Sequence, residues 1–291
     1  MKVTYIIPSY NHSVFVIDSI ESVLNDTLKD IFDYELLIID DGSTDGSPEL
    51  IEQYLRGVDC SKIRFKAREN KGLSSTLNDL IDDSTGNYIR LCSSDDLIEQ
   101  GSTHLMLEKM IFHDADVAIG DALVINNSGG IVNYSSVKMH KGAKDELLVE
   151  DTVVSSLILN WCVAGPSLLV RKAIFDAFKY DSKKIIDDFY FILSVVNGGF
   201  SIVYVDIISS RYRIHGGNTS KTKDTARRIS NINCFLKTAE VFSVMDEANK
   251  KELAFVISLS KLKIAFLKKK YFSLVPLAIF FIWRKCALYF K

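Results

Sequence analysis

Residues Leu36–Ser47 read LLIIDDGSTDGS, and this stretch joins a buried strand to a helix start through an acidic turn. The apolar run predicts a strand over 35–39, and Asp40-Asp41-Gly42 predicts a turn because Asp and Gly tolerate left-handed backbone. Ser47-Pro48 then offers a helix cap followed by proline at the first helical position. Such a strand-to-helix unit is typical of parallel α/β sheets, which bind ligands at the carboxyl ends of their strands.

Three other motifs also follow predicted strands. Ile6–His12 (IIPSYNH) ends a strand over 3–7, Asn70–Gly72 (NKG) follows a strand over 63–66, and Ser94–Asp96 (SDD) ends a strand over 87–92. Helical patterns alternate with these strands, which predicts a largely parallel, doubly wound α/β sheet through about residue 100. Farther along, we expect strands at 117–119, 122–125, 166–170, 202–205 and 208–212, a helix at 187–196, and helices from 224 to the end.

Acidic pairs end two of the predicted strands, Asp40-Asp41 and Asp95-Asp96. Hard oxygen ligands of this kind suit Mg²⁺ or Mn²⁺, which are bound by few carboxylates together with substrate phosphates. Asn70-Lys71-Gly72 precedes a helix, where backbone N–H groups can hold a nucleotide, although the same residues also make an ordinary loop. Asp187-Asp188 opens an amphipathic helix, where acidic residues also simply favour the helix dipole.

Two further motifs follow in the chain, IDDFYFILSVVNGG (186–199) and YRIH (212–215). In this order, the whole set of motifs resembles glycosyltransferase family 2, the inverting nucleotide-sugar transferases of GT-A fold. The resemblance runs from about Val3 to about Ser220. It implies a Rossmann-like, mostly parallel sheet flanked by helices, with a catalytic domain over 1–220. The nucleotide-sugar half would be about 1–100 and the acceptor half about 101–220, followed by a C-terminal helical region over 221–291.

The same resemblance assigns roles to individual residues. Asp95 would face the ribose, and Asp96 would bind Mn²⁺ or Mg²⁺, with His215 as a weaker metal ligand. Ser93 stands where many members have the first Asp of the D-x-D motif, which leaves the number of protein ligands open. The remaining residues implied to bind the nucleotide-sugar, a UDP-sugar, are Pro8, Tyr10, Asn11, Asp41, Asn70, Lys71, Gly72 and Arg213.

The catalytic base implied by the resemblance is Asp188, with Asp187 as the alternative one residue away. A carboxylate base would take the proton of an acceptor hydroxyl. Attack from the face opposite the leaving nucleoside diphosphate then gives a single displacement with inversion, without a covalent enzyme intermediate. The expected acceptor is a polyprenyl-linked glycan used in the assembly of bacterial surface glycans or glycoproteins.

The last 39 residues carry eight Lys and Arg and no Asp or Glu, whereas the whole chain has a net charge of −2. Within them, Tyr271–Trp283 reads YFSLVPLAIFFIW between basic flanks. Thirteen apolar residues are too few to span a bilayer, so this pattern favours binding of 261–291 to an anionic membrane surface. The alternative is a helix that packs on the domain or on a second copy of the chain in a homodimer.

Composition and charge also bear on the location of the protein, its partners and its alternative functions. The five cysteines are scattered and form no C-x-x-C, and no signal peptide is evident, which predicts a cytoplasmic protein, peripheral on the inner face of the membrane. The basic residues of the tail lie beside apolar ones, so nucleic acid is not an expected partner. The alternatives to a glycosyltransferase are a nucleotidyltransferase and a non-catalytic sugar- or nucleotide-binding scaffold. A nucleotidyltransferase would need a Gly/Lys-rich phosphate loop after the first strand, and Pro8-Ser9-Tyr10-Asn11 is not such a loop.

Overall fold

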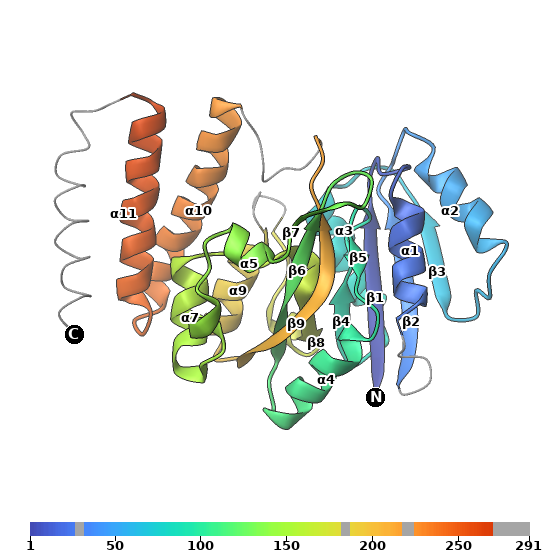
Figure 1. Ribbon diagram of the computed structural model, residues 1–291, viewed down its shortest axis with the longest axis horizontal. Helices are drawn as coiled ribbons and strands as arrows, with labels where there is room; N and C mark the ends of the chain where they lie inside the picture. Colours follow the sequence, from blue (N-terminus) through green and yellow to red (C-terminus); the bar gives the residue numbers. More distant parts are fainter. Residues whose placement is uncertain (27–31, 182–186, 217–223, 270–291) are drawn as a thin grey trace. The chain divides into compact units, whose positions relative to one another are not determined.

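The computed structural model describes residues 1–26, 32–181, 187–216 and 224–269 (Figure 1). The chain forms two compact units. The first comprises Met1–Lys183 and Gly198–His215, and the second comprises Lys184–Asn197 and Gly216–Lys291.

The first unit is an α/β sandwich built on one sheet. Among the described residues the sheet has nine strands in the order β3-β2-β1-β4-β8-β6-β9-β5, with β7 paired to β6. The strands are β1 (Lys2–Ser9), β2 (Asp33–Asp40), β3 (Ile63–Ala67), β4 (Tyr88–Leu91), β5 (Leu97–Ile98), β6 (Val117–Ile125), β7 (Ile131–Asn133), β8 (Leu168–Arg171) and β9 (Ile202–Arg213). The helices are α1 (Val16–Leu24), α2 (Ser47–Leu55), α3 (Leu73–Asp82), α4 (Ser102–Phe112), α5 (Ser136–Met139), α6 (Lys144–Leu147), α7 (Glu150–Leu159), η2 (Gly165–Ser167) and α8 (Ile174–Ala177).

Strand direction determines which loops meet. β1 is parallel to β2 and β4, β2 is parallel to β3, and β6 is parallel to β9. β8 is antiparallel to both β4 and β6, so these two strands point the same way. The loops after β1, β2, β3, β4, β6 and β9 therefore emerge at one edge, and the predicted parallel α/β arrangement is confirmed for the first four strands.

Alternation along the strands separates two apolar layers. Tyr5 and Ile7 of β1 join a core that includes Val16 and Ile20 of α1 and Met106 of α4. The intervening side chains point to the opposite face, because successive residues of a strand alternate between faces.

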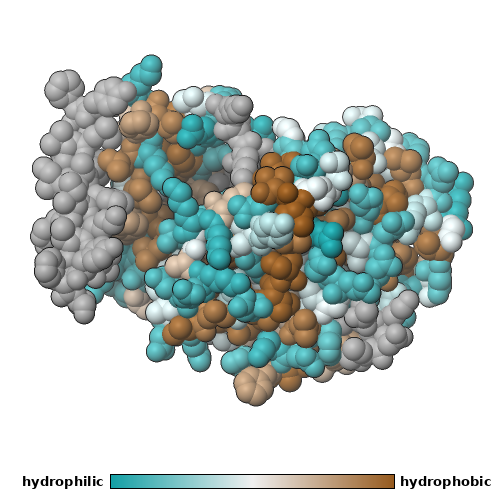
Figure 2. Space-filling view, in the orientation of Figure 1, coloured by the Kyte–Doolittle hydropathy of each residue, from teal (hydrophilic) through white to brown (hydrophobic). Residues whose placement is uncertain are grey.

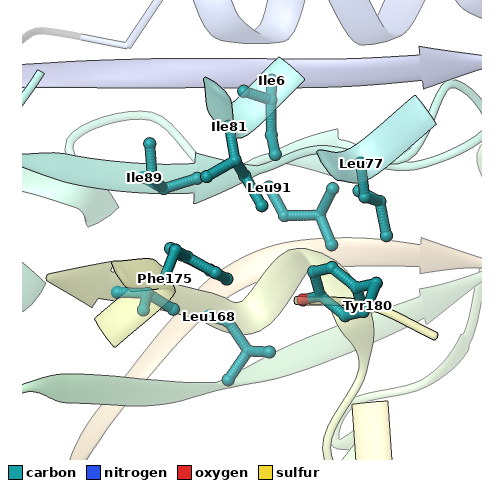
Figure 3. Close-up of a pocket in the computed structure, with 9 residues that line it drawn as sticks. Ile6, Leu77, Ile81, Ile89, Leu91, Leu168, Phe175 and Tyr180 are labelled. Atoms are coloured by element: carbon teal, nitrogen blue, oxygen red, sulfur yellow. The ribbon is translucent and has the colours of Figure 1, made fainter. Parts of the chain in front are cut away.

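That opposite face contains a small apolar cavity between α3, β1, β4, β8 and α8 (Figure 3). Its lining carries no charged side chain and consists of Ile6, Leu77, Ile81, Ile89, Leu91, Leu168, Val170, Phe175 and Tyr180. The cavity is part of the hydrophobic packing. On the surface, hydrophilic residues cover much of the face of this unit that Figure 2 shows.

Five of the expected strands correspond to three observed strands, β6, β8 and β9, with different bounds. The expected strands at 117–119 and 122–125 are one strand, β6, and those at 202–205 and 208–212 are one strand, β9. The pairing register between β6 and β9 shifts around Ile119 and Asp121, so the interruption read from the sequence is an irregularity within a continuous ladder. Pro166 lies in η2 rather than in β8, because proline has no N–H for the ladder.

The second unit is helical where it is described. It contains α9 (Asp187–Asn197), α10 (Thr225–Met245) and α11 (Lys250–Leu267). The side chain of Asp224 caps α10 by accepting a hydrogen bond from the Ala226 N–H, at 2.8 Å. Phe189 and Tyr190 of α9 contact Phe235 and Phe242 of α10, with ring centroids 5.0 and 5.6 Å apart. In the described part of the chain, no helix combines the length and the apolar character needed to cross a bilayer.

Glu35 is a buried carboxylate that joins β2 to its neighbours. It accepts hydrogen bonds from Thr4 Oγ1 at 2.7 Å and from the Thr85 N–H at 2.6 Å. It also forms an ion pair with Lys2 Nζ at 3.3 Å. Burial opposes ionisation of Glu35, but the hydrogen bonds from Thr4, Thr85 and Lys2 outweigh it and lower its pKa from 4.5 to about 2. The ionised carboxylate therefore stabilises the folded chain.

Glu35→Gln should lower the free energy of unfolding at pH 7 by about 1–3 kcal/mol, because charge-assisted hydrogen bonds are lost. A pKa that is lower in the folded state means that the contribution is complete above about pH 4.5 and is lost as the pH falls toward 2. Urea denaturation at pH 7 and pH 3 should show the difference between wild type and variant shrinking at the lower pH. Glu49→Gln, at an exposed position of α2, is the control. A constant difference across this range would contradict the role of Glu35.

Candidate active site

The loops after β1 and β2 are joined by buried polar contacts. Ser9 and Asp40 are register partners at the ends of these strands, and Ser9 Oγ donates to Asp40 Oδ2 at 2.9 Å. The Asn11 N–H donates to Ser43 Oγ at 2.8 Å, and Asn11 Oδ1 accepts from the Thr44 N–H at 2.8 Å. Asn11 adopts φ +54°, a conformation that Asn tolerates better than most residues. Asp40 and Asn11 thus hold the two loops together.

Asp41 holds the predicted nucleotide loop against the end of β2. Its Oδ1 accepts from Arg68 Nε at 2.9 Å and from the Lys71 N–H at 3.0 Å, and its Oδ2 accepts from the Gly72 N–H at 2.7 Å. Burial acts against ionisation, but these hydrogen bonds outweigh it and lower the pKa of Asp41. The structure therefore brings Asp41 together with the Asn70–Gly72 segment as a carboxylate.

The close approach of these loops requires glycine at position 42. Gly42 has φ +80°, and a Cβ atom there would lie 2.8 Å from the backbone nitrogen of Asn70. Both the backbone conformation and the space exclude a larger residue. Asn70, Lys71 and Gly72 are exposed beside this junction, and Tyr10 at the end of β1 is 49% exposed. Pro8, by contrast, is buried within β1.

A cluster of two histidines and a carboxylate lies where β1, β4 and β9 end. His215 Nε2 is 2.9 Å from Asp95 Oδ2, and His12 Nε2 is 3.9 Å from the same oxygen. In the described residues, one ligand atom from each of His12, Asp95 and His215 lies within 4.8 Å of the others. Imidazole nitrogens with a carboxylate oxygen form a donor set that fits a divalent first-row metal.

His12 is oriented by its second ring nitrogen. Nδ1 lies 2.8 Å from Ser94 Oγ, which leaves Nε2 directed toward Asp95. Burial lowers the pKa of His12, although the nearby Asp95 carboxylate acts in the opposite direction. The neutral imidazole that results is the form that binds metals. His12 is the last residue of the Ile6–His12 motif, and the family resemblance gives it no role. Its position directly after Tyr10-Asn11 is the signal for it in the sequence.

Asp96, the metal ligand predicted from the sequence, points inward. It is 2% exposed, and its Oδ1 accepts the Arg213 N–H at 2.7 Å. Burial raises the pKa of Asp96 well above its usual value, and the neighbouring Asp95 carboxylate raises it further. Asp95, which was predicted to face the ribose, is the member of this pair that meets His215. The geometry therefore places Asp95, rather than Asp96, beside the two histidines.

Arg213, which was predicted to bind the nucleotide-sugar, makes its observed contacts with the protein. Its guanidinium donates to the carbonyl oxygens of Asp95 and Asn127 at 2.8 and 2.9 Å, and it lies 3.3 Å from Asp18 Oδ2. It also stacks over Phe15, with 4.7 Å between the guanidinium carbon and the ring centroid. At 2% exposed, Arg213 positions the loop that carries Asp95.

Asp187 and Asp188, the two candidates for the base, open α9 in the second unit. The cluster around Asp95 consists of residues of the first unit. The assignment of the base to Asp188 stays a prediction from the motif.

The chain is similar in sequence to known glycosyltransferases. The model of the family described as "Glycosyl transferase family 2" matches residues 4–159, more than half of the chain. The chain is 27% identical over 227 residues to glycosyltransferase GlyA of Streptococcus pneumoniae serotype 4, and 24% identical over 234 residues to GlyG of the same organism. Each alignment covers 76% of this chain, but 32% of GlyA and 73% of GlyG.

Two solved structures have the same fold at low sequence identity. TarS of S. aureus (residues 1–349) in complex with UDP-GlcNAc superposes with a TM-score of 0.62 at 16% identity, covering 94% of this chain and 73% of TarS. The mannosyltransferase PcManGT of Pyrobaculum calidifontis, in complex with GDP-Man and Mn²⁺, gives a TM-score of 0.67 at 13% identity, covering 99% and 80%. The sheet topology, the strand-end motifs and the family match together identify the chain as a member of glycosyltransferase family 2 with the GT-A fold.

Proposed function

We propose that this chain is a metal-dependent, inverting glycosyltransferase that moves a hexosyl residue from a UDP-sugar to a hydroxyl group of a glycan acceptor. The observation that carries the proposal is the meeting of Asp95 and His215 with the loops after β1, β2 and β3 at one edge of the sheet. A cation site beside these polar loops suits a nucleoside diphosphate, because the cation can bind its phosphate oxygens. The complexes of TarS with UDP-GlcNAc and of PcManGT with GDP-Man and Mn²⁺ support a nucleotide-sugar donor.

Uracil is the base that the first loops suit best. The Asp41 carboxylate has about four acceptor positions, and Arg68, Lys71 and Gly72 use three of them. The imino N–H of uracil would be a further donor to this carboxylate. The exposed ring of Tyr10 can stack on the base, and Asn70 to Gly72 form the loop beside it.

Asp95 and His215 would hold Mn²⁺ or Mg²⁺, and Arg213 and Asp96 keep the Asp95 loop in place. The bound cation would neutralise the charge that develops on the leaving diphosphate. Asp188 would take the proton of the acceptor hydroxyl, which makes the oxygen a competent nucleophile. With one base and no covalent intermediate, the displacement inverts the anomeric carbon.

The acceptor we propose is a lipid-linked glycan at the inner face of a bacterial membrane. The support is the charge of the C-terminal tail, where Lys268 to Lys270 precede the apolar run 271–283. The run itself lies outside the described residues. Basic residues next to aromatic and aliphatic ones suit a surface of anionic lipid.

UDP should stabilise the protein against heat more than GDP does in the presence of Mn²⁺, because Asp41 and Tyr10 match uracil. Tyr10→Ala should weaken UDP binding by about tenfold or more, since stacking of a base on an aromatic ring contributes about 1–3 kcal/mol. Thermal unfolding and calorimetric titration measure these effects, with Tyr134→Ala, another exposed tyrosine, as the matched control. Equal or greater stabilisation by GDP would refute the uridine assignment.

Asp188→Asn keeps the side-chain shape and removes the proton acceptor. Turnover with a UDP-sugar and acceptor should fall by about 10²–10⁴, whereas the dissociation constant for UDP should stay the same. Asp187→Asn is the matched neighbour and should retain most activity. If Asp187→Asn abolishes turnover and Asp188→Asn does not, the base is the preceding residue.

The full-length protein should sediment with vesicles that contain anionic phosphatidylglycerol at low salt, and not with neutral phosphatidylcholine vesicles. Replacing Lys268, Lys269 and Lys270 with Gln should weaken this binding by about a hundredfold or more, because each basic residue contributes about 1 kcal/mol near an anionic surface. Replacing Lys141, Lys250 and Lys251 with Gln is a charge-matched control. Failure of the wild type to sediment with anionic vesicles would assign the tail to packing or to a homodimer instead.

A further inference from the structure

We infer that His12 is a third protein ligand of the divalent cation, so that the site presents two imidazole nitrogens and one carboxylate oxygen. The inference rests on the proposed metal-dependent transfer and adds a residue to it. The added residue follows the end of β1, where the sequence motifs predict only contacts with the nucleotide-sugar.

The positions of the three donor atoms support a common ligand sphere. His215 Nε2 and His12 Nε2 lie 2.9 and 3.9 Å from Asp95 Oδ2, and one ligand atom from each of the three residues lies within 4.8 Å of the other two. Two atoms that each bind one ion at about 2.0–2.2 Å are at most about 4.4 Å apart. Shifts of a few tenths of an ångström therefore suffice to bring the three atoms around one cation.

The surroundings of His12 match those of a metal-binding histidine. Ser94 Oγ lies 2.8 Å from Nδ1, the type of outer contact that fixes the ring and leaves Nε2 for the metal. Phe15 and the His215 ring pack edge-on against the imidazole, with centroids 6.3 and 5.4 Å away. The loop that carries His12 is itself held by the Asn11 contacts with Ser43 and Thr44.

A second imidazole has a consequence for metal preference. Carboxylate and water oxygens suit Mg²⁺, whereas imidazole nitrogen raises affinity for first-row transition metals. With two histidines and one carboxylate, this site should prefer Mn²⁺ over Mg²⁺. His12 would then determine which cation the enzyme uses as well as how tightly it is held.

His12→Asn is the variant that distinguishes a metal-binding role of His12 from a packing role. Asn places a polar atom near the position of Nδ1, which retains the contact with Ser94, but it has nothing at the position of Nε2. His12→Gln instead supplies an oxygen or nitrogen near Nε2. His113→Asn, at an exposed position after α4, is the matched control.

Mn²⁺ binding can be measured without transfer, by paramagnetic resonance of the free ion and by the nitrogen couplings of the bound ion, with and without UDP. Wild type should show two imidazole nitrogens and His12→Asn one, with Mn²⁺ affinity reduced at least about tenfold, since even outer-shell partners cost 10–100-fold. The preference for Mn²⁺ over Mg²⁺ should fall in both His12 variants and stay unchanged in His113→Asn. Asp95→Asn should weaken Mn²⁺ binding in parallel.

Two results would overturn the inference. If His12→Asn keeps wild-type Mn²⁺ affinity and the same nitrogen couplings, His12 is not a ligand, and the proposed transferase with Asp95 and His215 stands. If the wild type binds neither Mn²⁺ nor Mg²⁺ in the presence of UDP, then the metal dependence in the proposed function fails together with the role of His12. Unfolding midpoints without metal verify that each variant is folded.

Discussion

The hydrogen bond from the Arg213 N–H to Asp96 Oδ1, 2.7 Å long, is the contact on which the site depends. It joins the end of β9 to the loop after β4, two segments that are more than a hundred residues apart in the sequence. The guanidinium of the same arginine reaches the carbonyl groups of Asp95 and Asn127 and lies beside Asp18 of α1. Because a buried charge is costly unless it is paired and hydrogen-bonded, these contacts hold Arg213 in one position.

As a consequence, the two adjacent carboxylates of the loop after β4 have different roles. Asp96 is turned into the protein and anchors the loop, and Asp95 is thereby presented to His215 and His12. The same division occurs after β2, where Asp40 bonds to Ser9 and Ser43 while Asp41 organises the segment from Arg68 to Gly72. In each pair the two carboxylates therefore have different partners.

The parallel sheet makes this arrangement possible. Six strands that point the same way deliver their loops to one edge, and buried side chains then connect those loops to one another. Arg68 is an example to which the sequence motifs assign no role. It contacts Asp41 and Thr76, and so links the loop after β3 to α3. A cation two residues before an Asn-x-Gly loop was the only signal for it in the sequence.

The sequence alone determined the family, the parallel α/β character of the first hundred residues and the set of loops that form the site. Those properties follow from local patterns: apolar runs of strand length, helix caps, and turn residues with the required backbone freedom. Only the tertiary structure decided which acid of each pair faces inward, that Arg213 is enclosed by protein groups, and that His12 stands beside Asp95. These features depend on contacts between segments 80 to 200 residues apart, such as His12 with Ser94 and Asp18 with Arg213, and local sequence does not encode the direction in which a side chain turns at a strand end.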